Sequence, residues 1–237
     1  MIVEVEMLKP AEYWNFDRKV IDIVAFPVGD RYPEEIITNY FSIYTGLINK
    51  FKPKRVFEIG VRYGYTAICM WWAATCDDRP FDFEYVGIDD ESYPPSPGVT
   101  VGSCTKANEN FKNKGCQESC KAIKWNSFDG IPSKFGTFNL IHIDGNHDFN
   151  GVWNDLHNCW PILNVGGIIV LDDYYFPQIK DAIHKWLELY TDSDNVLAVQ
   201  FINDERGHCL IRKTGYIKDD IEANPNIYKL FDKASMV

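Results

Sequence analysis

The sequence predicts an α/β fold in which a doubly wound, mostly parallel sheet carries helices on both faces and ends in an antiparallel hairpin. Strand-like and helix-like segments alternate at least four times along the chain, which is typical of a parallel sheet. The chain has 237 residues, of which 46% are hydrophobic, and this suits one large domain or at most two small ones. Its last two strand-like stretches are too close in sequence for a parallel crossover.

The first half of the chain alternates helix and strand from Pro33 onward. Apolar residues between Ile36 and Phe51 recur at helical spacing, and Pro33 suits the first turn of such a helix. The segments that follow are expected to be a strand over 54–60, a helix over 65–75, a strand over 83–89, a helix near 105–114 and a strand near 121–125.

The second half continues the alternation. We expect a buried strand over 138–144, a helix that stops near Pro161, a buried strand over 167–173, a helix around 179–187, and strands over 195–202 and 207–213. The sequence thus divides into an N-terminal segment, 1–33, a domain over 34–213 and a polar tail over 214–237. The N-terminal segment is a candidate substrate lid or oligomer contact.

The charge balance argues against polyanionic partners. The chain has 24 basic and 34 acidic residues, a formal net charge of −10, and no basic run. Affinity for nucleic acid depends on clustered Lys and Arg, so nucleic acids and anionic membranes are poor partners. Aromatic residues make up 15% of the chain, which excludes a disordered acidic protein.

The cysteines and the N-terminal sequence indicate a reducing compartment. Seven cysteines form an odd set, and Glu4, Glu6 and Lys9 interrupt what a signal peptide would need as its apolar core. No apolar run approaches the roughly 18 residues that span a bilayer. We therefore expect a soluble, cytoplasmic protein with reduced thiols. Cys116 and Cys120 have a C-x₃-C spacing that is not typical of zinc sites.

Acidic residues end several predicted strands, where ligands of open α/β sheets bind. They are Glu58, Asp89, Asp144, Asp172 and Asp173.

A glycine-containing turn follows the predicted strand over 54–60. In Glu58-Ile59-Gly60-Val61-Arg62-Tyr63-Gly64, a dinucleotide motif would need glycine where Arg62 stands, and an acid before the turn suits a cationic ligand. Asp89, at the next strand end, can accept hydrogen bonds from both hydroxyls of a ribose. The alternatives are an ordinary tight turn and a solvated Asp that begins a loop.

The ends of the predicted strands over 138–144 and 167–173 together form a candidate metal site with a candidate base. Adjacent strands lie roughly 4.8 Å apart, so Asp144 would crowd against Asp172 and Asp173. Like charges this close either raise the pKa of one carboxyl sharply or recruit a cation, and all-oxygen ligands favour a hard one such as Mg²⁺, with Ca²⁺ or Mn²⁺ as alternatives. His147 lies three residues after Asp144 and can accept a proton. The alternatives are a solvated strand end and a helix-capping or surface histidine.

The remaining histidines are not expected in the site. His142 falls within a buried strand and is expected in the core. His157, His184 and His208 have no sequence neighbours that suggest chemistry.

Three segments together resemble a known family. FEIGVRYGYTA, YVGIDDE and FNLIHIDGNHDFNGVWNDLHNCWPILNVGGIIVLDDYY resemble successive motifs of class I S-adenosylmethionine-dependent methyltransferases. The last one resembles the subgroup of macrocin-type sugar O-methyltransferases and cephalosporin-biosynthesis methyltransferases. The resemblance covers about 34–213 and implies a Rossmann-like, seven-stranded sheet.

The resemblance also implies roles for individual residues. The methionine part of the cofactor would lie at the turn, the ribose at Asp89 and the adenine near Asn126 and Ser127. The implied cofactor set is Glu58, Gly60, Arg62, Tyr63, Gly64, Asp89, Asn126, Ser127 and Asp144. The implied catalytic residues are His147 and Asp144, and the implied Mg²⁺ ligands are Asp144, Asp172 and Asp173. KWNSFDG departs from the family's Gly-Asp-Ser-like form at the adenine position.

These observations predict transfer of a methyl group from S-adenosylmethionine to a hydroxyl of a small molecule, of sugar or natural-product type, in a chain that can form a homo-oligomer. The acceptor pocket is expected to involve 1–33, the loop 90–104 and the segment 174–177. An alternative is a non-catalytic protein that binds S-adenosylmethionine or a nucleotide. A nucleotide-dependent oxidoreductase is disfavoured by Arg62.

Overall fold

The computed structural model describes residues 34–75, 80–92, 101–190, 197–202 and 206–213. The described residues divide into two compact units, a first unit within 34–126 and a second unit within 127–213. The predictions for 1–33, for 214–237 and for the prolines between Tyr93 and Pro97 lie outside the described residues. No helix in those described ranges has the length and apolar character needed to cross a bilayer.

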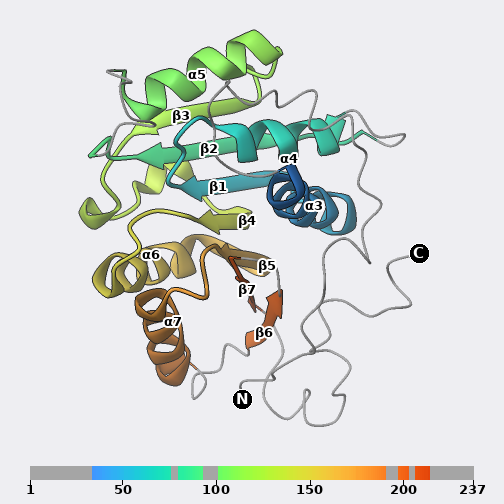
Figure 1. Cartoon of the computed structure of the whole chain (residues 1–237). Helices are drawn as coiled ribbons and strands as arrows, with labels where there is room; N and C mark the ends of the chain where they lie inside the picture. Colours follow the sequence, from blue (N-terminus) through green and yellow to red (C-terminus); the bar gives the residue numbers. More distant parts are fainter. Residues whose placement is uncertain (1–33, 76–79, 93–100, 191–196, 203–205, 214–237) are drawn as a thin grey trace. The chain divides into compact units, whose positions relative to one another are not determined.

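The described part of the first unit alternates three helices with three strands. Its elements are α3 (Glu34–Phe51), β1 (Arg55–Ile59), α4 (Tyr65–Thr75), β2 (Glu84–Asp89), α5 (Ser103–Lys114) and β3 (Cys120–Lys124). The strands are parallel in the order β3-β2-β1 (Figure 1), with Ile59 opposite Ile88 and Asp89 opposite Lys124. Because the strands are parallel, their carboxyl ends lie at one edge.

Strand β1 and helix α4 contribute buried residues to the hydrophobic core of this unit. The four residues from Val56 to Ile59 are all buried, which is typical of a parallel strand covered on both faces. Helix α4 has no charged residue and buries six of its eleven residues. A helix without a polar face is stable only when it is packed against other elements.

The second unit contains η1 (Ser127–Asp129), η2 (Ser133–Phe135), β4 (Phe138–Ile143), α6 (Phe149–Ile162), β5 (Leu163–Leu171), α7 (Pro177–Tyr190), β6 (Leu197–Ile202) and β7 (His208–Lys213). The strand order is β4-β5-β7-β6 (Figure 1). Strands β4 and β5 are parallel, whereas β7 is antiparallel to both β5 and β6. The predicted hairpin with one reversed strand near an edge is therefore confirmed.

The predicted α/β fold class is confirmed for the described residues, which form seven strands that alternate with helices and end in the hairpin.

The bounds of β5 differ from the prediction, whereas α6 ends at Ile162, near Pro161 as predicted. The helix includes Pro161, because a proline this near the end of a helix disrupts only the last turn. The Lys213 ammonium donates hydrogen bonds to the carbonyls of Trp160 and Leu163, 3.0 Å from each, and so satisfies groups left open at the helix end. Strand β5 begins at Leu163. Its pairing with β4 is irregular opposite the stretch from Phe138 to Leu140, so the sequence pattern does not predict its first residues as a strand.

Substitution of Gly64 tests how tightly the first unit is packed. It has φ +73, and a Cβ there would lie 2.5 Å from Cε1 of Phe111. Gly115 has φ +77 with nothing within 4 Å of a Cβ. Both Gly→Ala variants meet the left-handed penalty of about 1–2 kcal/mol, whereas Gly64→Ala also overpacks the core, at about 1–3 kcal/mol. Urea unfolding should therefore show the larger loss for Gly64→Ala. Equal losses for the two variants would contradict the packing at Phe111.

Candidate functional site

The turn between β1 and α4 is built from left-handed backbone conformations. Gly60 has φ 92, Arg62 has φ 48 and Gly64 has φ 73. The Gly60 N–H donates to the Ile88 carbonyl, 2.9 Å away, and the Gly64 N–H donates to the Val61 carbonyl, 2.8 Å away. The glycines adopt these conformations without steric cost, whereas Arg62 does not. A bulky residue in this region of backbone space points to a local constraint.

Asp89 supplies that constraint at the end of β2. Its Oδ2 accepts a hydrogen bond from the Arg62 N–H, 3.2 Å away, and its Oδ1 accepts one from the Glu91 N–H, 2.8 Å away. Burial raises the pKa of Asp89, and the two backbone hydrogen bonds partly offset that rise. Each carboxylate oxygen has a further lone pair, so Asp89 can still accept hydrogen bonds from a ligand.

Glu58 lies beneath the turn, within β1. It is 1% exposed and accepts a hydrogen bond from the buried Tyr85 hydroxyl. Burial, and then the neighbouring Glu58, raise the pKa of Tyr85 well above its ordinary value. Tyr63 is also buried, and its carbonyl accepts a hydrogen bond from Asn110 Nδ2 at 2.9 Å. Glu58 and Tyr63, two of the predicted cofactor residues, are thus fixed by packing.

The two residues predicted to lie near an adenine fall in different units. Asn126 belongs to the first unit, is exposed, and follows Trp125, whose N–H donates to the Asp89 carbonyl, 3.0 Å away. Ser127 begins the second unit, and its carbonyl accepts a hydrogen bond from Asn158 Nδ2 at 2.8 Å.

In the second unit, Asp144 and Asp172 directly follow two paired strands. Ile143 of β4 is opposite Leu171 of β5, and the Asp172 N–H donates to the Ile143 carbonyl, 3.1 Å away. The prediction that these strands are neighbours is confirmed. Side chains of adjacent residues on paired strands point to the same face, so the two carboxylates are held close together.

Asp172 and Asp173 are buried, with 3% and 1% exposure. The alternative of a solvated strand end is therefore wrong. Asp173 has φ 56, and its N–H donates to Asp172 Oδ1, 2.8 Å away. Burial raises the pKa of Asp172 to about 6. Carboxylates this deep need partners that compensate for lost hydration.

Arg206 and His208 are those partners, and the sequence analysis missed both. Arg206 forms two hydrogen bonds with Asp173, Nε to Oδ1 at 2.8 Å and Nη2 to Oδ2 at 3.0 Å. Arg206 Nη1 also lies 3.5 Å from Asp172 Oδ2, and His208 Nε2 lies 3.1 Å from Asp172 Oδ1. The expectation that His208 has no chemical neighbours is wrong. The signal was the hairpin, because β7 begins beside the end of β5.

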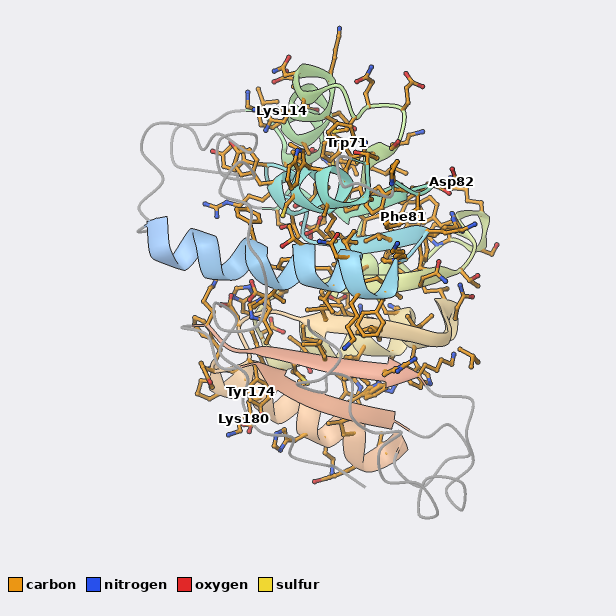
Figure 2. All side chains as sticks on the ribbon, turned by 90° about the vertical axis from the view of Figure 1, so that its right-hand side faces the viewer. Trp71, Phe81, Asp82, Lys114, Tyr174 and Lys180 are labelled. Carbon is orange, nitrogen blue, oxygen red and sulfur yellow. The ribbon has the colours of Figure 1, made fainter. Side chains whose placement is uncertain are left out.

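Backbone contacts hold the segment after Asp173 against Arg206. The Tyr174 N–H donates to the Gly207 carbonyl at 2.9 Å, and the Tyr175 N–H donates to the Arg206 carbonyl at 3.1 Å. The Tyr174 hydroxyl lies 2.8 Å from His184 Nε2, and the Lys180 ammonium lies 5.7 Å from the centroid of the Tyr174 ring (Figure 2). Helix α7 and the hairpin therefore fix this segment from both sides.

His147 faces the acids from the loop before α6. Its Nε2 lies 3.4 Å from Asp144 Oδ1 and 3.4 Å from Asp173 Oδ2. The hydrogen bond with Asp144 raises the pKa of His147; burial opposes this, and the negative charges of the acids add to it. Burial raises the pKa of Asp144, but His147 and the positive charges nearby outweigh it and lower that pKa. His147 is thus a stronger base than an isolated imidazole.

His147 does not cap helix α6. The N-cap is Asp148, whose Oδ1 accepts a hydrogen bond from the Gly151 N–H at 2.7 Å. The Asp148 N–H in turn donates to Asn146 Oδ1 at 3.1 Å. The helix-capping alternative for His147 is therefore wrong, and its side chain is left to face the carboxylates.

The acidic cluster fits a divalent cation. A cavity of about 10 Å³, the size of one water molecule, is lined by Ile143, Asp144, Gly145, Asn146, His147, Val152, Leu171, Asp172 and Ile179. Asp172 Oδ2 is buried and makes no hydrogen bond among the described residues. Three carboxylates face one guanidinium, which leaves a formal charge of −2 when the histidines are neutral. Carboxylate oxygens are preferred ligands of Mg²⁺ and Ca²⁺.

Arg206→Met tests whether the buried acids depend on their arginine. Removing one partner of a buried pair leaves an uncompensated charge, so we expect a loss of about 3–5 kcal/mol. The control is Arg55→Met, because Arg55 pairs with Glu84 at 2.8 Å with the two side chains 32% and 55% exposed. That exposed pair should contribute less than about 1 kcal/mol. Urea unfolding measures both, and similar small losses would contradict the pairing at Asp173.

One protein-family model matches the chain. Residues 57–174 match the family model described as a methyltransferase domain. No curated relative matches the chain by sequence.

Three solved structures share the fold over most of the chain. The SAH-bound methyltransferase PaMTH1 of Podospora anserina is 21% identical, with a TM-score of 0.58, over 84% of this chain and 88% of that one. The O-methyltransferase TomG of Streptomyces achromogenes, involved in tomaymycin synthesis and solved with SAM, is 14% identical, with a TM-score of 0.58, over 88% and 100%. An O-methyltransferase of Bacillus cereus in complex with SAH is 13% identical, with a TM-score of 0.56, over 90% and 94%.

At these identities the structures show the common fold, and the comparisons do not single out the macrocin-type subgroup. The family match and the fold together support the class I methyltransferase that the three sequence motifs predict.

Proposed function

We propose that the chain transfers a methyl group from S-adenosylmethionine to a hydroxyl of a small molecule. The observation that carries this proposal is the group of His147 with Asp144 and Asp173, within a segment that matches a methyltransferase domain. The solved structures with this fold that are described as bound to SAM or SAH support the same cofactor.

The first unit is proposed to bind the cofactor. The left-handed Gly60 is partly exposed and leaves the backbone of the turn open to close approach, and Glu58 offers a carboxylate beneath it. This suits the cationic methionine part of S-adenosylmethionine. Asp89 would accept hydrogen bonds from the ribose hydroxyls, and Asn126 lies next to Trp125, which is bonded to Asp89.

The proposed reaction is a displacement at carbon. The acceptor oxygen attacks the methyl carbon, and the new O–C bond forms as the C–S bond breaks and its electron pair stays on sulfur, leaving S-adenosylhomocysteine. The hydroxyl proton passes to the imidazole of His147, at Nδ1 when Nε2 donates to Asp144. The positions of these groups can lower the barrier by several kcal/mol through orientation.

The acids are proposed to hold a divalent ion such as Mg²⁺. Asp144, Asp172 and Asp173 would be its ligands, and the ion would supply a Lewis acid that lowers the pKa of the acceptor hydroxyl. Arg206 keeps Asp173 in place, and His208 keeps Asp172 in place. Partners of this kind orient metal ligands in many proteins.

Phe176, an exposed aromatic residue near His147, and two exposed aromatic residues close to these two in sequence, Tyr175 and Phe149, support a position for the acceptor. Phe176 is 49% exposed, and its ring centroid lies 5.7 Å from that of His147. Tyr175 and Phe149 are 44% and 37% exposed. Aromatic faces stack on flat or ring-shaped ligands, so these side chains support an acceptor with a ring, as in a sugar or an aromatic natural product.

Asp89→Asn tests the proposed cofactor site. Losing the charged acceptor should weaken S-adenosylmethionine binding about 10- to 100-fold, which corresponds to about 1.5–3 kcal/mol. Asp90→Asn removes the same charge at an exposed neighbour whose side chain accepts a hydrogen bond from the Ser92 N–H, and it should leave the affinity unchanged. Calorimetric titration measures both variants. Absence of binding to the unaltered chain at millimolar cofactor would refute the proposed function.

His147→Ala tests the proposed base. We expect the rate of S-adenosylhomocysteine release, with a panel of hydroxylated aromatic and sugar acceptors, to fall about 10²- to 10⁴-fold. Cofactor affinity should change less than about twofold. The control is His157→Ala, because His157 Nδ1 lies 2.8 Å from the Trp153 carbonyl within α6. A non-catalytic binding protein predicts no dependence of turnover on His147.

A further inference from the structure

Four side chains from three strands share one face of the sheet in the second unit. His142 and Asp144 are two positions apart on the path of β4, so they point to the same side. Asp144 continues the β4–β5 register beside Asp172. Asp172 in turn continues the β5–β7 register opposite His208. Register alone therefore places two imidazoles and two carboxylates together.

The two carboxylate oxygens of Asp172 differ, because one accepts a hydrogen bond and the other makes none among the described residues. Its Oδ1 accepts a hydrogen bond from the Asp173 N–H at 2.8 Å and lies 3.1 Å from His208 Nε2. Its Oδ2 is buried, makes no hydrogen bond among the described residues, and has Arg206 Nη1 3.5 Å away. Asp172 and Asp144 both line the small cavity. A buried carboxylate oxygen without a hydrogen bond is suited to a cation.

His142 adds a nitrogen donor to these oxygens. It is fully buried, and one of its ring nitrogens lies within 4.8 Å of a carboxylate oxygen of Asp144 and of one of Asp172. Ligands bonded to one ion at about 2.0–2.2 Å lie about 3–4 Å from one another. Small side-chain rotations therefore bring these three atoms into a common coordination shell.

We propose that the group of His142, Asp144 and Asp172 binds a divalent transition-metal ion, such as Co²⁺ or Zn²⁺, with an imidazole nitrogen of His142 as a ligand. Imidazole suits these ions, whereas Mg²⁺ and Ca²⁺ prefer oxygen. Mn²⁺ also prefers oxygen but accepts a mixed set of oxygen and nitrogen ligands, so it can serve as a spectroscopic probe of the same site. The inference rests on the metal part of the proposed function and not on methyl transfer. It gives the two histidines of this segment different tasks, since His142 binds the ion and His147 stays available to accept a proton.

His208 then orients the site from outside the coordination shell. It contacts Asp172 Oδ1 and leaves Oδ2 for the ion. Arg206 stays on Asp173, which it holds with two hydrogen bonds. The residual charge of −2 in the cluster matches a divalent ion, whichever of these ions is bound.

Mn²⁺ binding to the full chain tests this inference. Titration followed by electron paramagnetic resonance gives the affinity, and pulsed measurements detect ¹⁴N nuclei bonded to the ion. We expect nitrogen coupling in the unaltered chain and in His147→Gln. We expect it to be absent in His142→Gln, whose Mn²⁺ affinity should fall at least about 10-fold. His157→Gln is the control for an unrelated histidine of α6.

The outcomes separate this inference from the proposed function. Mn²⁺ bound without nitrogen coupling in the unaltered chain overturns the role of His142 and leaves the carboxylate site standing. Coupling that disappears in His147→Gln overturns it as well, and that variant removes only a partly exposed side chain. If neither Mn²⁺ nor Mg²⁺ binds, the inference and the proposed metal both fail, whereas calorimetry still reports S-adenosylmethionine binding. If His142→Gln does not fold, His208→Gln takes its place, because His208 Nε2 lies 3.1 Å from Asp172 Oδ1. Coupling kept in both His147→Gln and His208→Gln leaves His142 as the nitrogen ligand, and coupling lost in His208→Gln overturns the proposal.

Discussion

The pair formed by Arg206 and Asp173 is the interaction on which the acidic site depends. Asp173 is buried in a left-handed conformation, and two hydrogen bonds from Arg206 compensate for its lost hydration. The same guanidinium reaches Asp172, and backbone hydrogen bonds from Tyr174 and Tyr175 hold the segment after β5 against the hairpin. Without this arginine, three carboxylates would repel one another at the ends of β4 and β5.

Arginine compensates only part of the charge of the acidic cluster. One guanidinium faces three carboxylates, and the remaining negative charge is what the proposed divalent ion would neutralise. Asp144 belongs to both candidate groups, with His147 on the exposed side and His142 on the buried side. The carboxylate shared by the two groups can thus raise the basicity of one imidazole while it contributes, with the other, to binding an ion.

In the first unit, a single carboxylate fixes two segments of backbone. Asp89 bonds to the backbone of Arg62 and of Glu91, so one side chain fixes the turn after β1 and the loop after β2. The unfavourable backbone of Arg62 is offset by this hydrogen bond and by the strain-free glycines on either side. The backbone of the turn is therefore fixed in the conformation that we propose for contact with the cofactor.

The sequence by itself determined the order of the elements, the hairpin and the acids at the strand ends, because periodicity and connection length are local properties. It also indicated Asp144 and His147 as neighbours through their spacing of three residues. Only the tertiary structure decided that Asp172 and Asp173 are buried and that Arg206 and His208 are their partners. Those partners lie more than thirty residues away and are brought there by the β5–β7 register, which no local pattern specifies.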